Sequence, residues 1–161
     1  MAQTTEKQSA TINGKALSLY EQDILLWVED TVAKLKVQDF ENLDLENLIE
    51  EVESLGISQR LQLLNRLTVL LEHLLKRLYV KLPQDYNGWE RTIRTQRRYL
   101  ENLLEDSPSL KSIWSERLDC AWKSALKAVR EDYPQVSFPD RFPYATDVDT
   151  LLNQKYWEIE S

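Results

Sequence analysis

The sequence has few of the residues that end helices or form tight turns. Its 161 residues include three glycines and five prolines. No stretch is rich in the alternating Val, Ile and Thr that favour strands, and β-hairpin turns need residues that tolerate a positive φ, chiefly Gly and Asn. The composition therefore argues against a β-rich fold and favours an all-α protein.

Cysteine and long apolar runs are also scarce. The single Cys120 cannot form an internal disulfide, which fits a reducing compartment. The polar N-terminal residues lack the apolar core of a signal peptide, and no segment has the roughly 18 uninterrupted apolar residues of a membrane span. We therefore expect a cytoplasmic protein with no membrane partner.

The chain has fewer positively than negatively charged residues. The chain has 20 Lys and Arg against 27 Asp and Glu, a net charge of −7. Binding to nucleic acid or to anionic lipid depends on clustered cations that release counterions. The charge balance therefore argues against nucleic acid as a general partner.

Leucine, by contrast, is abundant. Ten leucines fall within residues 58–82, at spacings of three and four that form two neighbouring stripes. A face this wide needs several other helices to cover it. The sequence predicts an all-α fold in one domain over 18–161, a bundle of about five main helices around a central helix at 58–82, after a disordered tail at 1–17.

Capping and turn residues set the other predicted boundaries. Ser18 and Glu21 have capping-box spacing at the start of a helix that runs to about Val37. Gly56 is expected to stop a short helix that Asp44 caps, and turn residues at 83–88 should follow the central helix. Further helices are predicted over 89–105, 108–131 and 146–154, with an irregular segment over 134–143 whose large aromatic side chains should pin it to the bundle.

Carboxylates cluster before the central helix. Residues 37–59 contain seven acidic side chains and no Lys or Arg, and Glu46, Glu50 and Glu53 share a narrow arc beside an apolar face. Such carboxylates could ligate Mg²⁺ or Mn²⁺, with His73 as a nitrogen ligand, in a metal-dependent hydrolase. The chain has no Glu-x-x-His pair and no second His, so solvation or pairing with nearby cations is favoured.

Arginines form the second candidate site. Arg91, Arg94 and Arg98 recur at i, i+3 and i+7, with Arg97 close by, and guanidinium groups suit phosphate or carboxylate. This face could bind an anion or a nucleic acid. Pairing with the acidic face is the simpler interpretation, because four arginines in an acidic chain are too few for an electrostatic footprint.

Motifs of known enzymes are missing. The sequence contains no Gly-rich phosphate loop, no nucleophile elbow and no paired-cysteine zinc spacing. His73, the only histidine, has no recognisable catalytic partner and is interpreted as a neutral, structural side chain. Five tryptophans and seven tyrosines are many for this length, and some could mark a partner surface. The favoured interpretation is a non-enzymatic module that binds a protein partner or forms a homodimer, without a cofactor.

Several blocks of the sequence resemble one bacterial family. LDLENLIEEVESLG, LTVLLEHLLK, WERTIRTQRRYLENLLEDSPSLK and FPDRFPY occur in the order found in domain-of-unknown-function family twenty-nine, common in cyanobacteria. The resemblance covers about Leu19 to Leu152. It implies a small all-helical cytoplasmic protein, and it implies no established activity, cofactor or catalytic residue.

Overall fold

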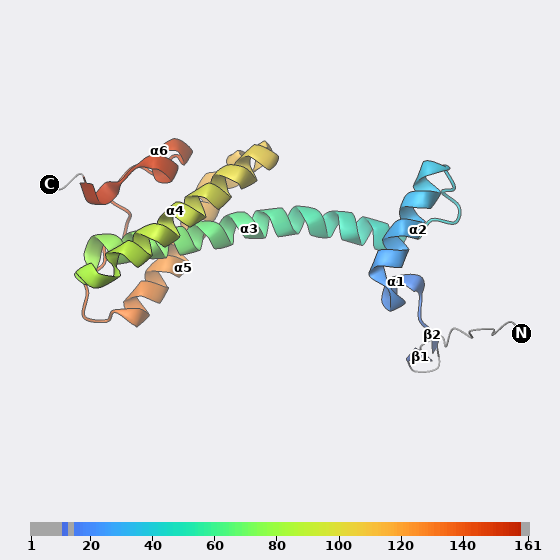
Figure 1. The fold of residues 1–161 in the computed structure, drawn as a ribbon, viewed down its shortest axis with the longest axis horizontal. Helices are drawn as coiled ribbons and strands as arrows, with labels where there is room; N and C mark the ends of the chain where they lie inside the picture. The colour runs from blue at the N-terminus through green and yellow to red at the C-terminus, as the bar shows by residue number, and fades with distance from the viewer. Residues whose placement is uncertain (1–10, 13–14, 159–161) are drawn as a thin grey trace, which may run out of the picture. The chain divides into compact units, whose positions relative to one another are not determined.

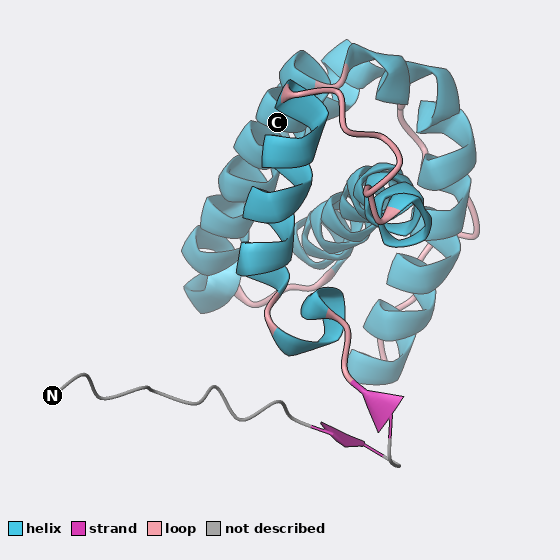
Figure 2. Cartoon of the chain, turned by 90° about the vertical axis from the view of Figure 1, so that its right-hand side faces the viewer, coloured by secondary structure: helices cyan, strands magenta, loops and turns pink. Residues whose placement is uncertain are grey.

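The computed structural model describes residues 11–12 and 15–158, and their fold confirms the all-α prediction. The non-helical exception is a pair of two-residue antiparallel strands, β1 (Thr11–Ile12) and β2 (Lys15–Ala16), drawn in magenta in Figure 2. The predicted tail at 1–17 lies mostly outside the described residues, and its described part holds these two strands.

Six α-helices and two 3₁₀-helices account for most of the described chain (Figure 1). None of the described helices is long and apolar enough to cross a membrane. In chain order the elements are α1 (Leu19–Gln22), α2 (Ile24–Lys36), α3 (Leu45–Tyr79), α4 (Pro83–Asp106), η1 (Pro108–Ile113), α5 (Trp114–Asp132), α6 (Val148–Asn153) and η2 (Tyr156–Glu158).

The chain divides into two compact units. The first is Met1–Leu55 and the second is Gly56–Ser161, so α3 contributes residues to both. The sequence predicts a single bundle over 18–161. Two units arise because the helices α4 and α5 pack on the second half of α3, whereas residues 45–55 belong with α1 and α2.

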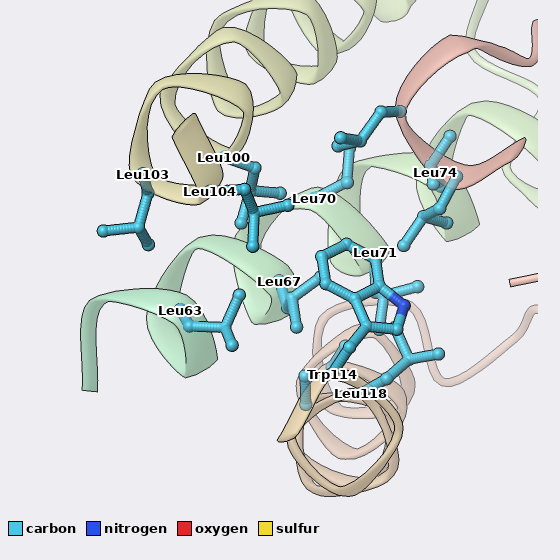
Figure 3. Close-up of a cluster of buried hydrophobic side chains, with 14 of the residues drawn as sticks. Leu63, Leu67, Leu70, Leu71, Leu74, Leu100, Leu103, Leu104, Trp114 and Leu118 are labelled. Carbon is cyan, nitrogen blue, oxygen red and sulfur yellow. The ribbon is translucent and has the colours of Figure 1, made fainter. Parts of the chain in front are cut away.

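The core of the second unit is built on the leucines of α3. Leu63, Leu67, Leu70 and Leu74 have no exposed surface, and they lie between α4 and α5 (Figure 3). Leu61, from the neighbouring stripe, is 51% exposed. The prediction that both stripes need covering is therefore confirmed for the first stripe and for Leu71 and Leu75 of the second, which are 1% and 0% exposed, and it is wrong at Leu61. α4 contributes Leu100, Leu103 and Leu104 to this core, and α5 contributes Trp114 and Leu118.

Three predicted helix boundaries are wrong for local reasons. Gly56 does not end a helix, because α3 passes through it without a break. The predicted 18–37 helix is interrupted at Asp23, whose backbone is extended (φ −156°, ψ 99°) and whose side chain caps α2. Residues 83–88 are helical, because Pro83 occupies the first position of α4, where its missing N–H costs nothing.

The C-terminal segment is held to the bundle by side-chain bonds to its backbone. Trp114 donates from Nε1 to the Thr146 carbonyl at 2.9 Å, and the hydroxyl of the buried Tyr156 donates to Ala145 at 3.2 Å. Phe138 is buried in the irregular 134–143 segment. These contacts confirm the prediction that aromatic side chains fix this segment, and α6 lies within the predicted 146–154 helix.

Candidate functional site

The first unit begins with two consecutive caps. Ser18 and Glu21 form the predicted capping box, in which Glu21 Oε2 accepts from the Ser18 N–H at 2.8 Å. Asp23 Oδ1 then accepts from the N–H groups of Leu25 and Leu26, both at 3.1 Å. Because each cap satisfies N–H groups that the helix leaves unpaired, α1 and α2 can meet at a sharp bend.

Trp27 fixes α2 against the start of α3. Its side chain is 3% exposed, and its Nε1 donates to Asp44 Oδ2 at 3.0 Å. The Tyr20 ring meets the Trp27 ring edge to face at 5.0 Å, and the Tyr20 hydroxyl donates to Glu51 Oε1 at 2.6 Å. Two aromatic side chains thus tie α1, α2 and α3 together through hydrogen bonds.

These hydrogen bonds shift two pKa values in opposite directions. The bond to the Glu51 carboxylate, with smaller effects of burial and nearby acids, raises the pKa of Tyr20 to about 12. Bonds from Asn47, and then from Trp27, lower the pKa of the Asp44 carboxyl against the opposing effect of desolvation. Near neutral pH, Tyr20 is therefore a donor and Asp44 an ionised acceptor.

Apolar side chains of the first unit remain exposed. Of the sixteen exposed large hydrophobic residues in the described chain, thirteen belong to this unit, whereas Trp27 and Thr31 are its only buried residues among those described. Exposure reaches 59% at Val52 and 67% at Leu55. A monomeric protein rarely leaves so much apolar surface uncovered, so this is a candidate binding surface.

A shallow groove runs through this surface between α2 and the start of α3. Its volume is about 280 Å³, and apolar side chains form most of its walls. Trp27 lies in the groove wall and Glu51 closes one part of it. The lining residues are Ile24, Trp27, Val28, Thr31, Val32, Leu35, Leu48, Glu51, Val52 and Leu55.

Carboxylates border the apolar surface. Residues 16–55 contain eleven acidic residues and two lysines, and Lys34 is bonded to Asp30 at 2.6 Å. Glu46, Glu50 and Glu53 are exposed, and within the first unit none makes an ion pair with another described residue. We call α2 and residues 45–55, with this carboxylate border, the acidic apolar surface.

The side chains predicted as metal ligands are not assembled into a cluster. Among the described residues, no three or more His, Cys, Asp or Glu side chains are gathered closely enough to hold a metal ion. Glu46, Glu50 and Glu53 belong to the first unit and His73 to the second. Binding of Mg²⁺ or Mn²⁺ by these residues stays a prediction.

His73 is held inside the second unit. The carbonyl of Val69 accepts from its Nδ1 at 2.8 Å, one turn earlier on α3. Burial lowers the pKa of His73, Lys76 lowers it further, and the Val69 bond and Glu72 oppose both. His73 is thus a neutral, hydrogen-bonded side chain near neutral pH, as a structural histidine would be.

The predicted arginine face divides into buried and exposed members. Arg97 is 8% exposed, and its guanidinium donates to the carbonyls of Leu151 at 3.0 Å and Gln154 at 2.6 Å. Arg97 therefore holds α6 and cannot belong to an exposed anion site. Arg91, Arg94 and Arg98 are exposed on α4.

An exposed aromatic ring accompanies these arginines. Tyr99 is 43% exposed, the Arg66 guanidinium lies 4.2 Å from the centre of its ring, and Arg98 lies 6.0 Å from it. We call Arg66, Arg91, Arg94, Arg98 and Tyr99 the arginine surface. Its flat, cationic groups suit carboxylates and apolar side chains alike.

A second groove lies in the second unit, between α5 and the C-terminal segment. It has a volume of about 300 Å³, and Leu118, Asp119, Trp122 and Arg141 are among its lining residues. Trp122 donates from Nε1 to the Asp140 carbonyl at 3.0 Å. Because Nε1 of Trp122 is already bonded within the chain, this groove is a weaker candidate than the acidic apolar surface.

Sequence reasoning missed the contacts that build the candidate surface. The sequence predicts Asp44 as a helix cap, but no local sequence pattern predicts its hydrogen bond with Trp27. The apolar periodicity of α2 predicts a helix, and it does not tell whether the apolar side chains are buried. A count of carboxylates around that apolar stripe would have been the available signal for an exposed surface.

The fold defines an all-α protein, and among its described residues no group of three or more His, Cys, Asp or Glu side chains could hold a metal ion. Comparison with known families identifies the family. The family model described as "Domain of unknown function DUF29" matches residues 19–157, and the chain belongs to this family. No curated protein and no solved structure matches the chain.

Proposed function

We propose that this chain is a non-enzymatic protein-interaction module of the cytoplasm, and that the acidic apolar surface is its binding surface. One observation carries the proposal: thirteen exposed large hydrophobic residues lie in a unit whose only buried residues, among those described, are Trp27 and Thr31. Apolar surface exposed on this scale is stable when a partner removes it from water.

The way the surface is held supports the same function. Trp27 and Tyr20 fasten α1 and α2 to the start of α3 through bonds to Asp44 and Glu51. The apolar side chains are therefore presented on helices that are already fixed to one another. A preorganised surface loses less conformational entropy on binding than a flexible one.

A photo-crosslinking amino acid at Val52 tests this function inside the cells that make the protein. Val52 lines the groove, so a partner seated on the surface will be captured. The matched control carries the same amino acid at Lys123, which is exposed on α5. We expect an adduct of defined mass from position 52 and none from 123, and the absence of any protein adduct at 52 would reject the proposal.

The two other functions suggested by the sequence have less support. A metal-dependent hydrolase needs Glu46, Glu50 and Glu53 to converge with His73, and no described cluster brings three such ligands together. Binding of free anions or nucleic acid through four arginines loses Arg97, which is bonded to two backbone carbonyls. Both stay predictions, and neither has a specific observation in its favour.

A further inference from the structure

We infer that the partner of the acidic apolar surface is a second copy of this chain, which docks there through its arginine surface. The inference rests on the proposed function and names the occupant. Glu46, Glu50 and Glu53 are exposed in the first unit, and Arg91, Arg94 and Arg98 are exposed in the second. In a twofold dimer each chain would offer one surface of each kind, and both would be used.

Charge decides which part of the second copy fits. Residues 16–55 carry eleven acidic residues and two lysines. Packing two acidic apolar surfaces face to face would place carboxylates opposite carboxylates, which is strongly unfavourable. The exposed arginines of α4 provide the opposite charge, and Arg91, Arg94 and Arg98 make no ion pair with a described residue of their own unit.

The spacing of the charges also matches. Glu46, Glu50 and Glu53 follow one another at intervals of four and three, and Arg98, Arg94 and Arg91, taken in reverse, follow the same intervals. Both sets lie along one side of an α-helix and span about 10 Å of its axis. Antiparallel docking of α3 on the partner's α4 therefore brings each carboxylate opposite one guanidinium.

Apolar contact accompanies the charges. Tyr99 is the one large hydrophobic residue of α4 that is exposed, and Arg66 stacks on it. Beside it, a groove of about 290 Å³ opens on α3, lined by Gln62, Asn65, Arg66 and Val69. An exposed tyrosine and the aliphatic parts of four arginines give Leu45 and Ile49, the exposed apolar residues that flank the carboxylates on α3, a surface on which to pack.

The available area suits a stable dimer. The ten exposed large hydrophobic residues of α2 and residues 45–55 are roughly half exposed and offer on the order of 800 Å² per chain, as standard-size interfaces do. Because a twofold axis uses this area twice, the dimer would bury more surface than most weak contacts do. Rim ion pairs contribute little energy in water, so we assign the affinity to apolar burial and the register to the charges.

Charge reversal on the full-length chain tests the inference. The acid-reversed chain carries Glu46→Arg, Glu50→Arg and Glu53→Arg, and the arginine-reversed chain carries Arg91→Glu, Arg94→Glu and Arg98→Glu. All six positions are exposed, so circular dichroism should show unchanged helix content. Sedimentation velocity over a range of micromolar concentrations then measures the dimer dissociation constant of each chain alone and of the two mixed.

We expect the unaltered chain to dimerise, with affinity that falls as salt is raised. Each reversed chain alone should lose at least about a hundredfold in affinity, because like charges face each other in both interfaces. Mixing the two reversed chains should restore dimerisation to within about tenfold of the unaltered chain. One interface of the mixed dimer then has native charges, and the other has the same pairs with their signs exchanged.

Matched controls carry equal charge changes away from both surfaces. Exposed positions of η1 and α5 serve for this: Lys111→Glu, Lys123→Glu and Lys127→Glu in one chain, and Glu116→Arg, Asp119→Arg and Glu131→Arg in the other. Their dissociation constants should stay within about threefold of the unaltered value. A loss equal to that of the reversed chains would assign the effect to net charge and overturn the inference.

Three further results would overturn it. The first is a monomer at every concentration, the second is a dimer that both reversals leave intact, and the third is a mixture that fails to dimerise. The crosslinking at Val52 separates these results from failure of the proposed function. An adduct of chain with a different protein would retain the interaction module and reject the second copy, whereas no adduct rejects the module itself.

Discussion

Neighbouring arginines of α4 have opposite surroundings. Arg97 is buried and donates to two carbonyls at the end of α6, while Arg98, the next residue, is exposed. A helix turns by about 100° per residue, so adjacent side chains face different directions. Composition alone assigns both residues to one basic cluster, and helix geometry gives one of them a structural role.

Replacing Arg97 by Leu should destabilise the second unit by about 2–4 kcal/mol, because the carbonyls of Leu151 and Gln154 lose their charged donor. Urea unfolding measures the loss, and hydrogen exchange should show α6 opening first. Lys123→Leu on exposed α5 is the control and should change stability by less than about 0.5 kcal/mol. An Arg97→Leu variant as stable as the unaltered chain would contradict the assigned role.

His73, the only histidine, should make the free energy of unfolding depend on pH below neutrality. Burial lowers its pKa in the folded state below the ordinary value of 6.5. As pH falls below 6.5, His73 takes up a proton in the unfolded chain before it does so in the folded chain. The contribution of His73 to the free energy of unfolding is therefore fully present above pH 6.5 and is lost as pH falls through the lower pKa of the folded chain.

A His73→Gln variant tests this prediction through the free energy of unfolding, measured in urea at several pH values between neutrality and mild acid. The unaltered chain should lose stability as pH falls below 6.5, and the variant should lose less over the same interval. Carboxylates titrate in both proteins, so the difference between the two curves isolates His73. Parallel curves would show that the pKa of His73 is the same in the folded and unfolded chain.

At the scale of elements, the long helix α3 is the main departure from sequence-based expectation. Gly56 follows a plausible short helix and precedes Ser58, a good cap, so two helices are predicted where the structure has one. A glycine within a helix costs about 1 kcal/mol relative to alanine. Continuing the backbone hydrogen bonds through that residue is less costly than ending one helix and nucleating another.

Gly56→Ala distinguishes these two conformations. A Cβ at position 56 would meet Arg60 Nη1 at 3.5 Å, an ordinary contact with a flexible side chain. The substitution should therefore stabilise the protein by about 0.5–1 kcal/mol, seen as a higher urea midpoint with an unchanged slope. Gly88→Ala within α4, where an added Cβ meets nothing within 4 Å, should give a similar gain. A loss at position 56 would indicate a left-handed cap, as the sequence first predicts.

For the whole molecule, the two units differ in how much apolar surface they bury. The second unit buries leucines from α3 and α4 together with Trp114 and Tyr156. The first unit buries two described side chains and leaves thirteen large hydrophobic ones exposed. Stability within one chain therefore resides in the second unit, since burial of apolar surface is the main favourable term in folding.

Cutting the chain at the boundary between the units should separate a stable fragment from an unstable one. The fragment 56–161 should unfold cooperatively in urea and keep the near-ultraviolet signal of its packed tryptophans. The fragment 1–55 alone should show little helix by circular dichroism, because the cut removes most of α3 and leaves a unit that buries only two described side chains. A cooperatively folded, monomeric 1–55 fragment would contradict this account and weaken the case for a partner.

The sequence by itself determined the helical class, the capping box at Ser18, the central leucine stripe and the aromatic anchoring of the C-terminal segment. These features follow from local propensity and from the 3.6-residue period, which a linear chain displays directly. The acidic run at 37–59 was likewise visible, together with the arginines that follow it.

The tertiary structure decided what each of these features contacts. It buried Arg97 under α6, bonded Trp27 to Asp44, and left the apolar residues of α2 and of 45–55 exposed beside their carboxylates. An apolar stripe has the same pattern whether a neighbouring helix, a partner chain or nothing covers it. Which of these applies depends on contacts between residues far apart in the sequence, and periodicity carries no record of them.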